Sequence, residues 1–570
     1  MRFSGKFDGL KFVADEGVVH RLKDYYLLGN VHLHFRDELT DKLGIRHLDA
    51  EVISDHRLIL MAYNKWGIDA CKHLEGEWSF SLFDASRKCL YLTRDPSENC
   101  SIFFMVYESC LYFSSGTNYF QEQIPDGLEI DMREFSKASL RLMGTTNGKT
   151  MLKDLFYIPP GSYGCFSTAL VYRRGKIHEK NKEQLHYKFE KDYLLRFRSL
   201  FSNAVLVRMR TIDRVGIFLS SGLDSTSVAS FLSTSVGFKK RINAYTSIPY
   251  YIDSTDKHEL VSEKPLVEEF LERYPNVNGN FFDFPDASWM DCFRKQEHVN
   301  LFYPVVHSNT IWINGILEKA NADGVELMMT GQMGNYSISF NGLHPCFGIS
   351  FHSILYYLKY RFFGKYLFQK QQSKYSIMNN RVINDTVRTY FQKDELILGY
   401  RYFFSRSTFK KEAFKKLHAF ASTCWSLYAQ EYNIRVTDPT ADFRLVQFLH
   451  ALPSELYYKN GITKYLLKQS MCEMLPPNIV NNLFPKPQTA DLGARLKKEH
   501  FLATLVEKLT DRFQNNCFFD CEKLKAVFRE LQQTTSKGRQ HQLGFHLLFM
   551  ISMLHFYGKF EKREQGGGEN

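Results

Sequence analysis

A run of small and hydroxyl-bearing residues, VGIFLSSGLDSTS at 215–227, is the part of the sequence best suited to chemistry. The apolar residues 215–219 predict a buried strand, and the residues from Ser227 onward predict a helix. Between them lies a loop of small residues. A loop from a strand into a helix gathers backbone N–H groups and the positive end of the helix dipole at one point. The segment therefore predicts a phosphate site.

Within this loop, Asp224 does not suit a site for a bare anion, but it suits one in which a divalent cation lies between the carboxylate and the phosphates. The Gly-Lys-Ser/Thr ending of a P-loop NTPase is absent, so transfer of a γ-phosphoryl group is not favoured. A capped helix that simply follows a core strand is the alternative for this loop taken alone.

The segment SSGLDST resembles the SGGxDS pyrophosphate loop of the ATP-pyrophosphatases, in particular the asparagine synthetase-like branch. The resemblance implies that ATP is cleaved between its α- and β-phosphates, that a carboxylate is adenylated, and that the acyl group passes to an amine. Ser221 stands where that family has its first glycine. The implied ATP-binding residues, including two further segments introduced below, are Leu219, Ser220, Ser221, Gly222, Leu223, Asp224, Ser225, Thr226, Thr246, Ser247, Thr330, Gly331 and Gln332.

The composition sets the limits of the function. A chain of 570 residues should hold two or three domains. Its net charge of +11 favours acidic ligands such as ATP, whereas no motif supports nucleic-acid binding. The 11 cysteines are scattered, which is typical of a reducing compartment, and we expect a cytoplasmic protein. No stretch approaches the roughly 20 apolar residues of a membrane span, and the N-terminus has no signal core.

Residues 1–175 alternate between apolar and polar and predict a strand-rich domain, with a helix at 55–67. The segment LEGEWSFSLFDASRKCLYLTRD at 74–95 resembles a hairpin of the class II glutamine amidotransferase domain of asparagine synthetases. That domain is an αββα sandwich of the N-terminal-nucleophile type.

The chemistry of that domain is not expected here. The family's nucleophile is a cysteine freed by removal of the initiator Met, where this chain has Arg2, and the first cysteine is Cys71. The stretch 95–104, DPSENCSIFF, also lacks the Gly and Lys of the family's glutamine pocket. We therefore predict no glutamine hydrolysis.

After a polar linker at 176–192, residues 193–560 predict an α/β domain with a parallel sheet and a helical C-terminal part, followed by a flexible tail at 561–570. We expect helices at 193–209 and 259–273 and strands at 242–249 and 280–284. Thr246 and Ser247 lie at the carboxyl end of their strand, where ligands of parallel sheets bind.

A second small-residue loop, TGQMGN at 330–335, follows a predicted strand at 325–329 and stands in the place of the family's S-G-E-G-x-D-E. Gln332 replaces a Glu and Asn335 replaces an Asp, which removes charge but keeps hydrogen-bonding capacity. The resemblance implies that Asp224 and Asn335 hold Mg²⁺. The segment TGQMGN also resembles synthetase-like proteins that close macrolactam rings in lasso peptide pathways, and those proteins lack the nucleophilic cysteine too.

Two further segments, RVTDPTADFRLVQFL at 435–449 and GITKYLLK at 461–468, resemble family helices. The second implies that Lys464 is the cation that stabilises the transition state. The basic, aromatic residues 343–430 are interpreted as amphipathic helices beside the active site, and a basic loop at 485–491 is a candidate to close on the substrate.

Together these segments predict an ATP-dependent, AMP-forming ligase that joins a carboxylate to an amine. With the glutaminase lost, we expect an amine on the substrate itself, and hence a macrolactam formed on a lasso-type peptide, with a precursor-peptide protease as a partner. The sequence also resembles β-lactam synthetase. Asparagine synthetase acting on aspartate, with ammonia or glutamine, is one alternative, and a catalytically decayed nucleotide-binding relative is another.

Overall fold

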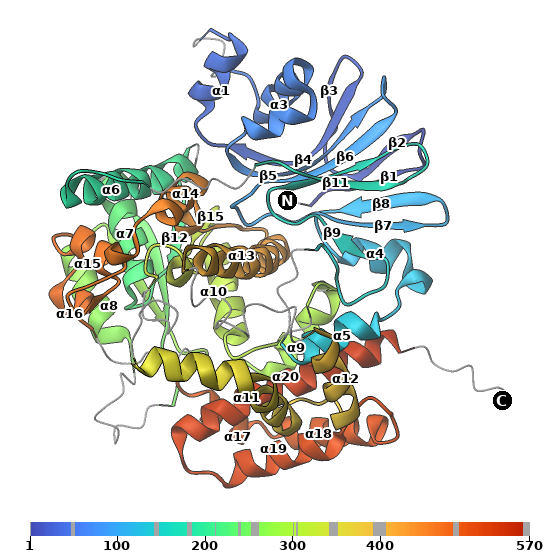
Figure 1. Cartoon of the computed structure of the whole chain (residues 1–570), viewed down its shortest axis with the longest axis vertical. Helices are drawn as coiled ribbons and strands as arrows, with labels where there is room; N and C mark the ends of the chain where they lie inside the picture. The colour runs from blue at the N-terminus through green and yellow to red at the C-terminus, as the bar shows by residue number, and fades with distance from the viewer. Residues whose placement is uncertain are drawn as a thin grey trace.

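The structure is a computed structural model of the 570-residue chain. It describes residues 2–46, 52–141, 147–178, 185–210, 212–236, 241–251, 262–299, 301–303, 306–340, 351–390, 406–482 and 489–561. Figure 1 shows an N-terminal β-rich part, an α/β part beside it, and a group of helices below both.

The N-terminal part is built from two antiparallel sheets. The first has the order β2-β1-β8-β7-β9 and the second β11-β10-β6-β5-β4-β3. The strands are β1 (Ser4–Phe7), β2 (Phe12–Glu16), β3 (His20–Leu22), β4 (Tyr25–Leu33), β5 (Gly76–Asp84), β6 (Cys89–Arg94), β7 (Phe103–Tyr107), β8 (Cys110–Ser114), β9 (Phe156–Tyr157), β10 (Ser162–Phe166) and β11 (Tyr172–Lys176). The predicted hairpin at 74–95 is confirmed as β5 and β6.

The two sheets pack face to face through a core that includes Phe7, Phe83 and Phe104. Helices cover the outer faces: α1 (Arg36–Leu43) and α3 (Asp55–Trp66) lie over the second sheet, and α4 (Asn118–Gln123) and α5 (Met132–Ser139) lie beside the first (Figure 1). The predicted αββα sandwich and its helix at 55–67 are therefore confirmed.

The second part contains a parallel sheet with the order β14-β13-β12-β15-β16. Its strands are β12 (Val215–Phe218), β13 (Ile242–Ser247), β14 (Val277–Phe282), β15 (Leu327–Met329) and β16 (Arg435–Thr437). The chain passes from β12 to β13 and β14 on one side of the sheet and then crosses to β15 and β16 on the other side of β12. In parallel sheets, this change of direction leaves a crevice at the carboxyl ends of the strands, here between β12 and β15.

Helices cover both faces of this sheet. Each face has its own hydrophobic core. Helix α7 packs into the core on one face, and α10 and α13 pack into the core on the other. On the first face lie α6 (Glu190–Leu206), α7 (Leu223–Val236), α8 (Lys264–Arg273), α14 (Phe443–Ala451), α15 (Tyr465–Met471) and α16 (Pro477–Val480), and on the second α10 (Thr310–Ala322) and α13 (Arg406–Glu431). A two-stranded hairpin, β17 (Tyr458–Lys459) and β18 (Ile462–Thr463), precedes α15.

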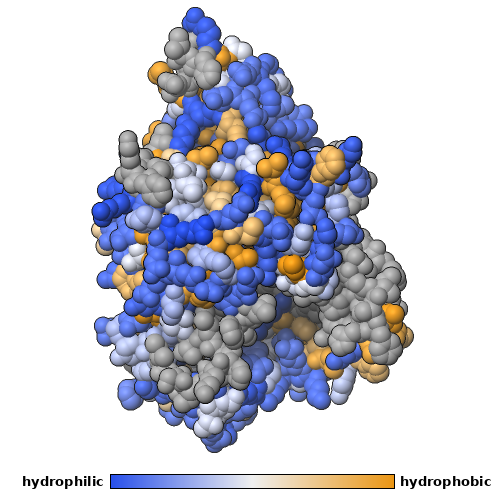
Figure 2. Space-filling model, turned by 90° about the vertical axis from the view of Figure 1, so that its left-hand side faces the viewer, coloured by the Kyte–Doolittle hydropathy of each residue, from blue (hydrophilic) through white to orange (hydrophobic). Residues whose placement is uncertain are grey.

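The remaining helices share a third core around α20 (Lys537–Phe560), with most of its second half buried. They are α9 (Trp289–Val299), α11 (Phe351–Tyr375), α12 (Asn380–Tyr390), α17 (Leu492–Lys498), α18 (Phe501–Phe513) and α19 (Cys521–Gln533). Figure 2 shows one face of the molecule, on which hydrophilic residues dominate and apolar ones form small separate groups. Within the described residues, no helix is both long and apolar enough to cross a membrane.

Several element bounds differ from those predicted. Helix α7 begins at Leu223 rather than Ser227, so the phosphate loop is shorter than expected. Strand β14 begins at Val277, and α6 begins at Glu190, inside the predicted linker. In the basic region, α13 reaches the pocket, whereas α11 and α12 pack against α19 and α5. The tail beyond residue 561 and positions 485–488 lie outside the described residues.

Candidate active site

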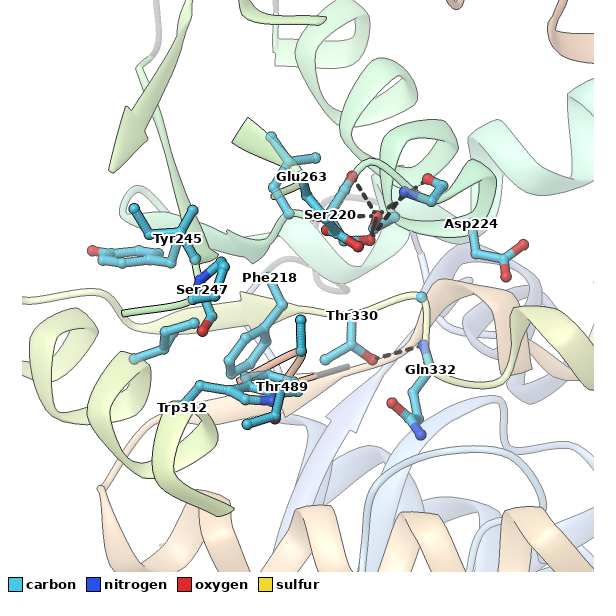
Figure 3. Close-up of a pocket in the computed structure, with 18 of the residues that line it drawn as sticks. Phe218, Ser220, Asp224, Tyr245, Ser247, Glu263, Trp312, Thr330, Gln332 and Thr489 are labelled. Carbon is cyan, nitrogen blue, oxygen red and sulfur yellow. Dashed lines mark hydrogen bonds between the residues drawn. The ribbon is translucent and has the colours of Figure 1, made fainter. Parts of the chain in front are cut away.

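A pocket of about 460 Å³ lies at the carboxyl edge of the parallel sheet. Both predicted loops and Lys464 contribute to its wall. Figure 3 shows Ser220 and Asp224 on one side, with Thr330 and Gln332 facing them across the pocket. The predicted residues that line it are Leu219, Ser220, Gly222, Leu223, Asp224, Ser225, Ser247, Thr330, Gly331, Gln332, Asn335 and Lys464.

The first loop is held by its own hydroxyl groups. The Ser225 Oγ accepts a hydrogen bond from Ser220 N at 3.1 Å and lies 2.7 Å from Ser220 Oγ. The Gly222 N–H donates to Ser220 Oγ at 3.2 Å. These bonds draw the chain into α7 four residues earlier than expected, and they place Asp224 in the first turn of the helix, where its charge complements the dipole.

Three predicted ATP-binding residues are outside the pocket wall. The Thr226 hydroxyl donates to the Gly222 carbonyl at 2.7 Å, and the Thr246 hydroxyl donates to the Leu219 carbonyl at 2.9 Å. The Ser221 side chain is buried. Their side chains therefore shape the strand ends and the loop, and direct contact with ATP stays a prediction for these three.

An acidic residue that the sequence analysis missed lies against the phosphate loop. The Ser221 N–H donates to a carboxylate oxygen of Glu263 at 3.0 Å, and Glu263 lines the pocket immediately before α8. One of the backbone N–H groups that the motif would present to phosphate is thus already hydrogen-bonded to a carboxylate. No sequence signal pairs these residues, because they are 42 positions apart.

The second loop packs tightly onto the first. A Cβ atom placed on Gly334 would lie 2.2 Å from Asp224 Cγ, and one on Gly331 would lie 2.9 Å from the Asp224 carbonyl carbon. Larger residues at either position would displace Asp224. The two glycines therefore allow the close approach that brings Asp224 and Asn335 together.

Asp224 and Asn335 are bridged by one hydroxyl group. The Ser339 Oγ lies 3.0 Å from Asp224 Oδ2 and 3.4 Å from Asn335 Oδ1. A carboxylate oxygen and an amide oxygen side by side are the kind of donors that Mg²⁺ prefers. The residues present therefore fit the predicted metal.

A buried carboxylate holds the second loop from behind. Asp438 Oδ2 accepts a hydrogen bond from the Met333 N–H at 2.7 Å, while the Thr330 N–H donates to the Thr437 carbonyl at 2.9 Å. Burial raises the pKa of Asp438 to about 6, although its hydrogen bonds with Thr440 and Met333 act in the opposite direction. The end of β16 thus fixes the backbone of the loop.

Lys464 has a left-handed backbone, with φ of +56°, at the N-cap of α15. A non-glycine residue in this region carries strain. The neighbouring hairpin of β17 and β18 maintains it, together with the hydrogen bond from Tyr465 N to the Tyr457 carbonyl at 3.1 Å. The conformation turns the chain so that Lys464 lines the pocket.

An ion pair between Asp491 and Arg495 braces another part of the pocket wall. Asp491 Oδ2 accepts from the N–H groups of Tyr250 and Tyr251 at 2.8 and 3.2 Å, and from Arg495 Nε at 2.8 Å. Arg495 also donates to the carbonyls of Phe284 and Asp283. This pair joins α17 to the ends of β13 and β14, a connection between residues too distant in sequence to be predicted.

The comparisons with known proteins agree with this architecture. Residues 14–177 match the family described as "Glutamine amidotransferase domain", and residues 196–344 and 428–555 match the family described as "Asparagine synthase". Together the sandwich, the parallel sheet and these matches define an ATP-dependent ligase that forms carbon–nitrogen bonds.

Three relatives show how far the similarity extends. The chain is 21% identical to asparagine synthetase [glutamine-hydrolyzing] 1 of Bacillus subtilis over 86% of this chain and 83% of that protein. It is 22% identical to the asparagine synthetase of Gallus gallus over 84% and 73%. A putative asparagine synthetase 2 of Methanocaldococcus jannaschii is 23% identical, over 50% of this chain and only 57% of its own length. The chain belongs to the asparagine synthetase-like family.

Proposed function

We propose that this ligase adenylates a side-chain carboxylate of a peptide and joins it to an amine of the same molecule, which closes a macrolactam ring. The observation that carries the proposal is the convergence of the Ser220–Ser225 loop, the Thr330–Asn335 loop and Lys464 on one pocket. ATP phosphates would bind the first loop and the start of α7, where N–H groups and the helix dipole favour anions.

The reaction proceeds in two steps. A carboxylate oxygen of the substrate attacks the α-phosphorus of ATP, and pyrophosphate leaves. The amine then attacks the acyl carbon, AMP leaves, and the amine loses a proton. Lys464 is the residue that would stabilise negative charge on the acyl-adenylate and on the leaving phosphate. Mg²⁺ held by Asp224 and Asn335 would neutralise the pyrophosphate.

The interior of the amidotransferase-like part supports an amine source other than glutamine. Glu98 and Cys100 stand where the resemblance expects the Gly and the Lys of a glutamine pocket, and both are buried. The Glu98 carboxylate is paired with the Arg208 guanidinium and accepts from Thr437 Oγ1 at 2.9 Å. Burial raises the pKa of the Cys100 thiol well above its usual value, so it stays protonated and poorly nucleophilic.

An amine on the substrate itself also has a physical advantage. Tethering holds the amine at high effective concentration beside the acyl carbon, so no separate ammonia supply is required. A protease that releases the leader from the precursor peptide is the partner that we propose, in a reducing cytoplasmic setting.

The test combines the purified chain, ATP, Mg²⁺ and a leader-free peptide that carries a free α-amine and an internal Asp or Glu. We expect AMP and pyrophosphate in equal amounts and a peptide lighter by one water. Asp224→Ala should abolish both products, whereas Asp286→Ala, at an exposed position, should leave them unchanged.

Two other outcomes would replace the proposal. AMP formation that requires free aspartate with ammonia or glutamine would assign asparagine synthesis, the activity named for the relatives above. Calorimetric binding of ATP with no AMP from any carboxylate, unaltered by Asp224→Ala, would assign a decayed nucleotide-binding protein.

A further inference from the structure

Helix α11 exposes apolar side chains that neither the pocket nor the hydrophobic cores explain. Between positions 354 and 366, the exposed large apolar residues are Ile354, Leu355, Leu358, Phe362, Phe363 and Tyr366. Phe362 is 70% exposed and Tyr366 is 61% exposed. Elsewhere in the described residues such side chains are scattered, which is normal for a protein surface, whereas a concentration of them marks a contact surface.

The second half of α11 is held to the body of the molecule. Phe368 and Tyr375 pack against the core around α20, and Lys374 pairs with Glu530 of α19 at 3.7 Å. The Tyr375 hydroxyl accepts a hydrogen bond from Arg539 at 2.7 Å. Figure 1 shows α11 in yellow, with one end beside α12 and the other extending away from it. The apolar side chains are therefore presented by a helix that is already formed and fixed at one end.

The charge around this surface has one sign. Residues 327–384 contain six Lys and Arg residues and no Asp or Glu. Lys359 and Lys365 are exposed among the apolar side chains, and Lys370 is exposed farther along the helix. A partner that suits this surface must offer negative charge and an apolar phase at the same place.

A membrane surface that contains anionic phospholipids meets both requirements. Phe, Tyr and Leu side chains enter the boundary between headgroups and acyl chains, while Lys side chains extend along it toward the lipid phosphates.

Two other partners suit the surface less well. Nucleic acid would offer phosphates to the cations and bases to the aromatic rings, but no apolar phase for Ile354, Leu355 and Leu358. A second copy of the chain that met this surface with the same surface would set cations against cations.

From these observations we infer that the first half of α11 lies on an anionic phospholipid surface, with its exposed apolar side chains in the interface and its Lys residues at the lipid phosphates. The helix lies along the membrane plane and does not cross the bilayer. This interaction is separate from the proposed ligase reaction, because it requires neither ATP nor a carboxylate.

The test is co-sedimentation of the full chain with vesicles of phosphatidylcholine alone or of equal amounts of phosphatidylcholine and phosphatidylglycerol. We expect the wild type to bind the anionic vesicles about 10-fold or more tightly than the neutral ones. Phe362→Ala combined with Phe363→Ala should weaken this binding about 10-fold or more, since two apolar groups no longer enter the interface.

Lys365→Gln combined with Lys370→Gln should weaken binding to the anionic vesicles by a similar factor, about 10-fold, and leave binding to neutral vesicles unchanged. The matched controls are Leu195→Ala and Arg196→Gln, an exposed apolar residue and an exposed cation on α6, which should have no effect. Far-ultraviolet circular dichroism checks that every variant is folded.

Four outcomes overturn the inference. They are absence of wild-type binding to the anionic vesicles, binding that the α11 variants leave unchanged, retention of single-stranded RNA in place of vesicles, and a dimer in sedimentation velocity that only the Phe362 and Phe363 variant dissociates. A chain that binds the vesicles but forms no pyrophosphate would refute the proposed function and leave the membrane assignment standing.

Discussion

Lys464 illustrates how a single residue in this molecule is placed for its role at some conformational cost. Its φ of +56° is left-handed, and it lies between the end of β18 and the start of α15, three residues after Gly461 in the hairpin turn. Strain of this kind persists where the surroundings enforce it, and it is concentrated at functional sites. The conformation at this position therefore accompanies a basic side chain that lines the pocket.

Replacing Lys464 with Met removes that charge and preserves length and apolar bulk. We expect the rate of pyrophosphate release to fall about 100-fold or more, the loss typical of one electrostatic contact with a transition state. ATP binding, measured by calorimetry, should change by only a few-fold. Lys468→Met, one turn along α15, is the matched control, and an equal loss in both variants would contradict the role.

Glu263 is a second single residue that affects the site, but it brings a negative charge to the phosphate loop. Its carboxylate accepts from the Ser221 N–H and would repel phosphates that approach this loop. Glu263→Gln removes the charge, so we expect the Kd of ATP to fall roughly 3- to 10-fold, as for one relieved like-charge contact. Glu268→Gln, on an exposed face of α8, should have no effect. Weaker ATP binding in Glu263→Gln would instead identify Glu263 as part of the nucleotide site.

At the scale of elements, the close packing of the two loops decides whether Asp224 is correctly placed. Gly334→Ala forces a methyl group toward Asp224, with only 2.2 Å available. We expect Mg²⁺-dependent ATP binding to weaken at least 10-fold while the far-ultraviolet circular dichroism is retained, because overpacking typically costs about 1–3 kcal/mol. Gly538→Ala, in α20 with open space around its Cβ, is the control. Unchanged ATP binding in Gly334→Ala would show that the loops separate without consequence.

The elements also show what the sequence could and could not predict. The strand, loop and helix around Asp224 are local, so apolar runs and small residues were sufficient to place them, apart from the early start of α7. Glu263 and Trp312 were assigned no role, and Asp438 and Asp491 were included only within longer segments, because each acts through partners tens to hundreds of positions away. Their residue types are common in any chain, and only the folded chain assigns them a contact.

At the scale of the whole molecule, buried polar groups join the amidotransferase-like part to the ligase part. Arg94 donates to Thr423 Oγ1 at 2.9 Å and Ser422 Oγ at 2.7 Å, and Asn99 donates to the Val436 carbonyl at 3.1 Å. Arg208 is paired with both Glu98 and Asp442. His34, Glu98 and Asp442 cluster closely enough to hold a metal ion, but the Arg208 guanidinium already supplies the positive charge.

His418 makes this junction sensitive to acid. Its Nε2 lies 2.8 Å from the Ser97 carbonyl and donates to it as neutral imidazole, and burial lowers the pKa of His418 to about 4. The unfolded chain therefore binds a proton between pH 6.5 and 4 that the folded chain does not, so stability falls as the pH falls through this window. The loss from His418 is on the order of 3 kcal/mol at most.

Chemical denaturation at pH 7 and at pH 4.5 checks this expectation. His418→Gln cannot be protonated and keeps a donor for Ser97, so its free energy of unfolding should decline less than that of the wild type over the same range. His555→Gln, on α20, serves as a comparison for general effects of removing a histidine. Parallel declines in wild type and His418→Gln would mean that other groups govern the acid sensitivity.

The ion pairs across the junction also bear on how the protein is made. Glu98 precedes its partner Arg208 by 110 positions, and Glu77 precedes Arg435 by 358. Because synthesis runs from the N-terminus, the amidotransferase-like part leaves the ribosome while Arg435 is still to be translated. Until then the carboxylates of Glu77 and Glu98 lack these partners, and the two ion pairs can form only when the ligase part is present. The amidotransferase-like part and the ligase part therefore complete each other's buried polar contacts, and the junction can form only after the ligase sheet has been translated.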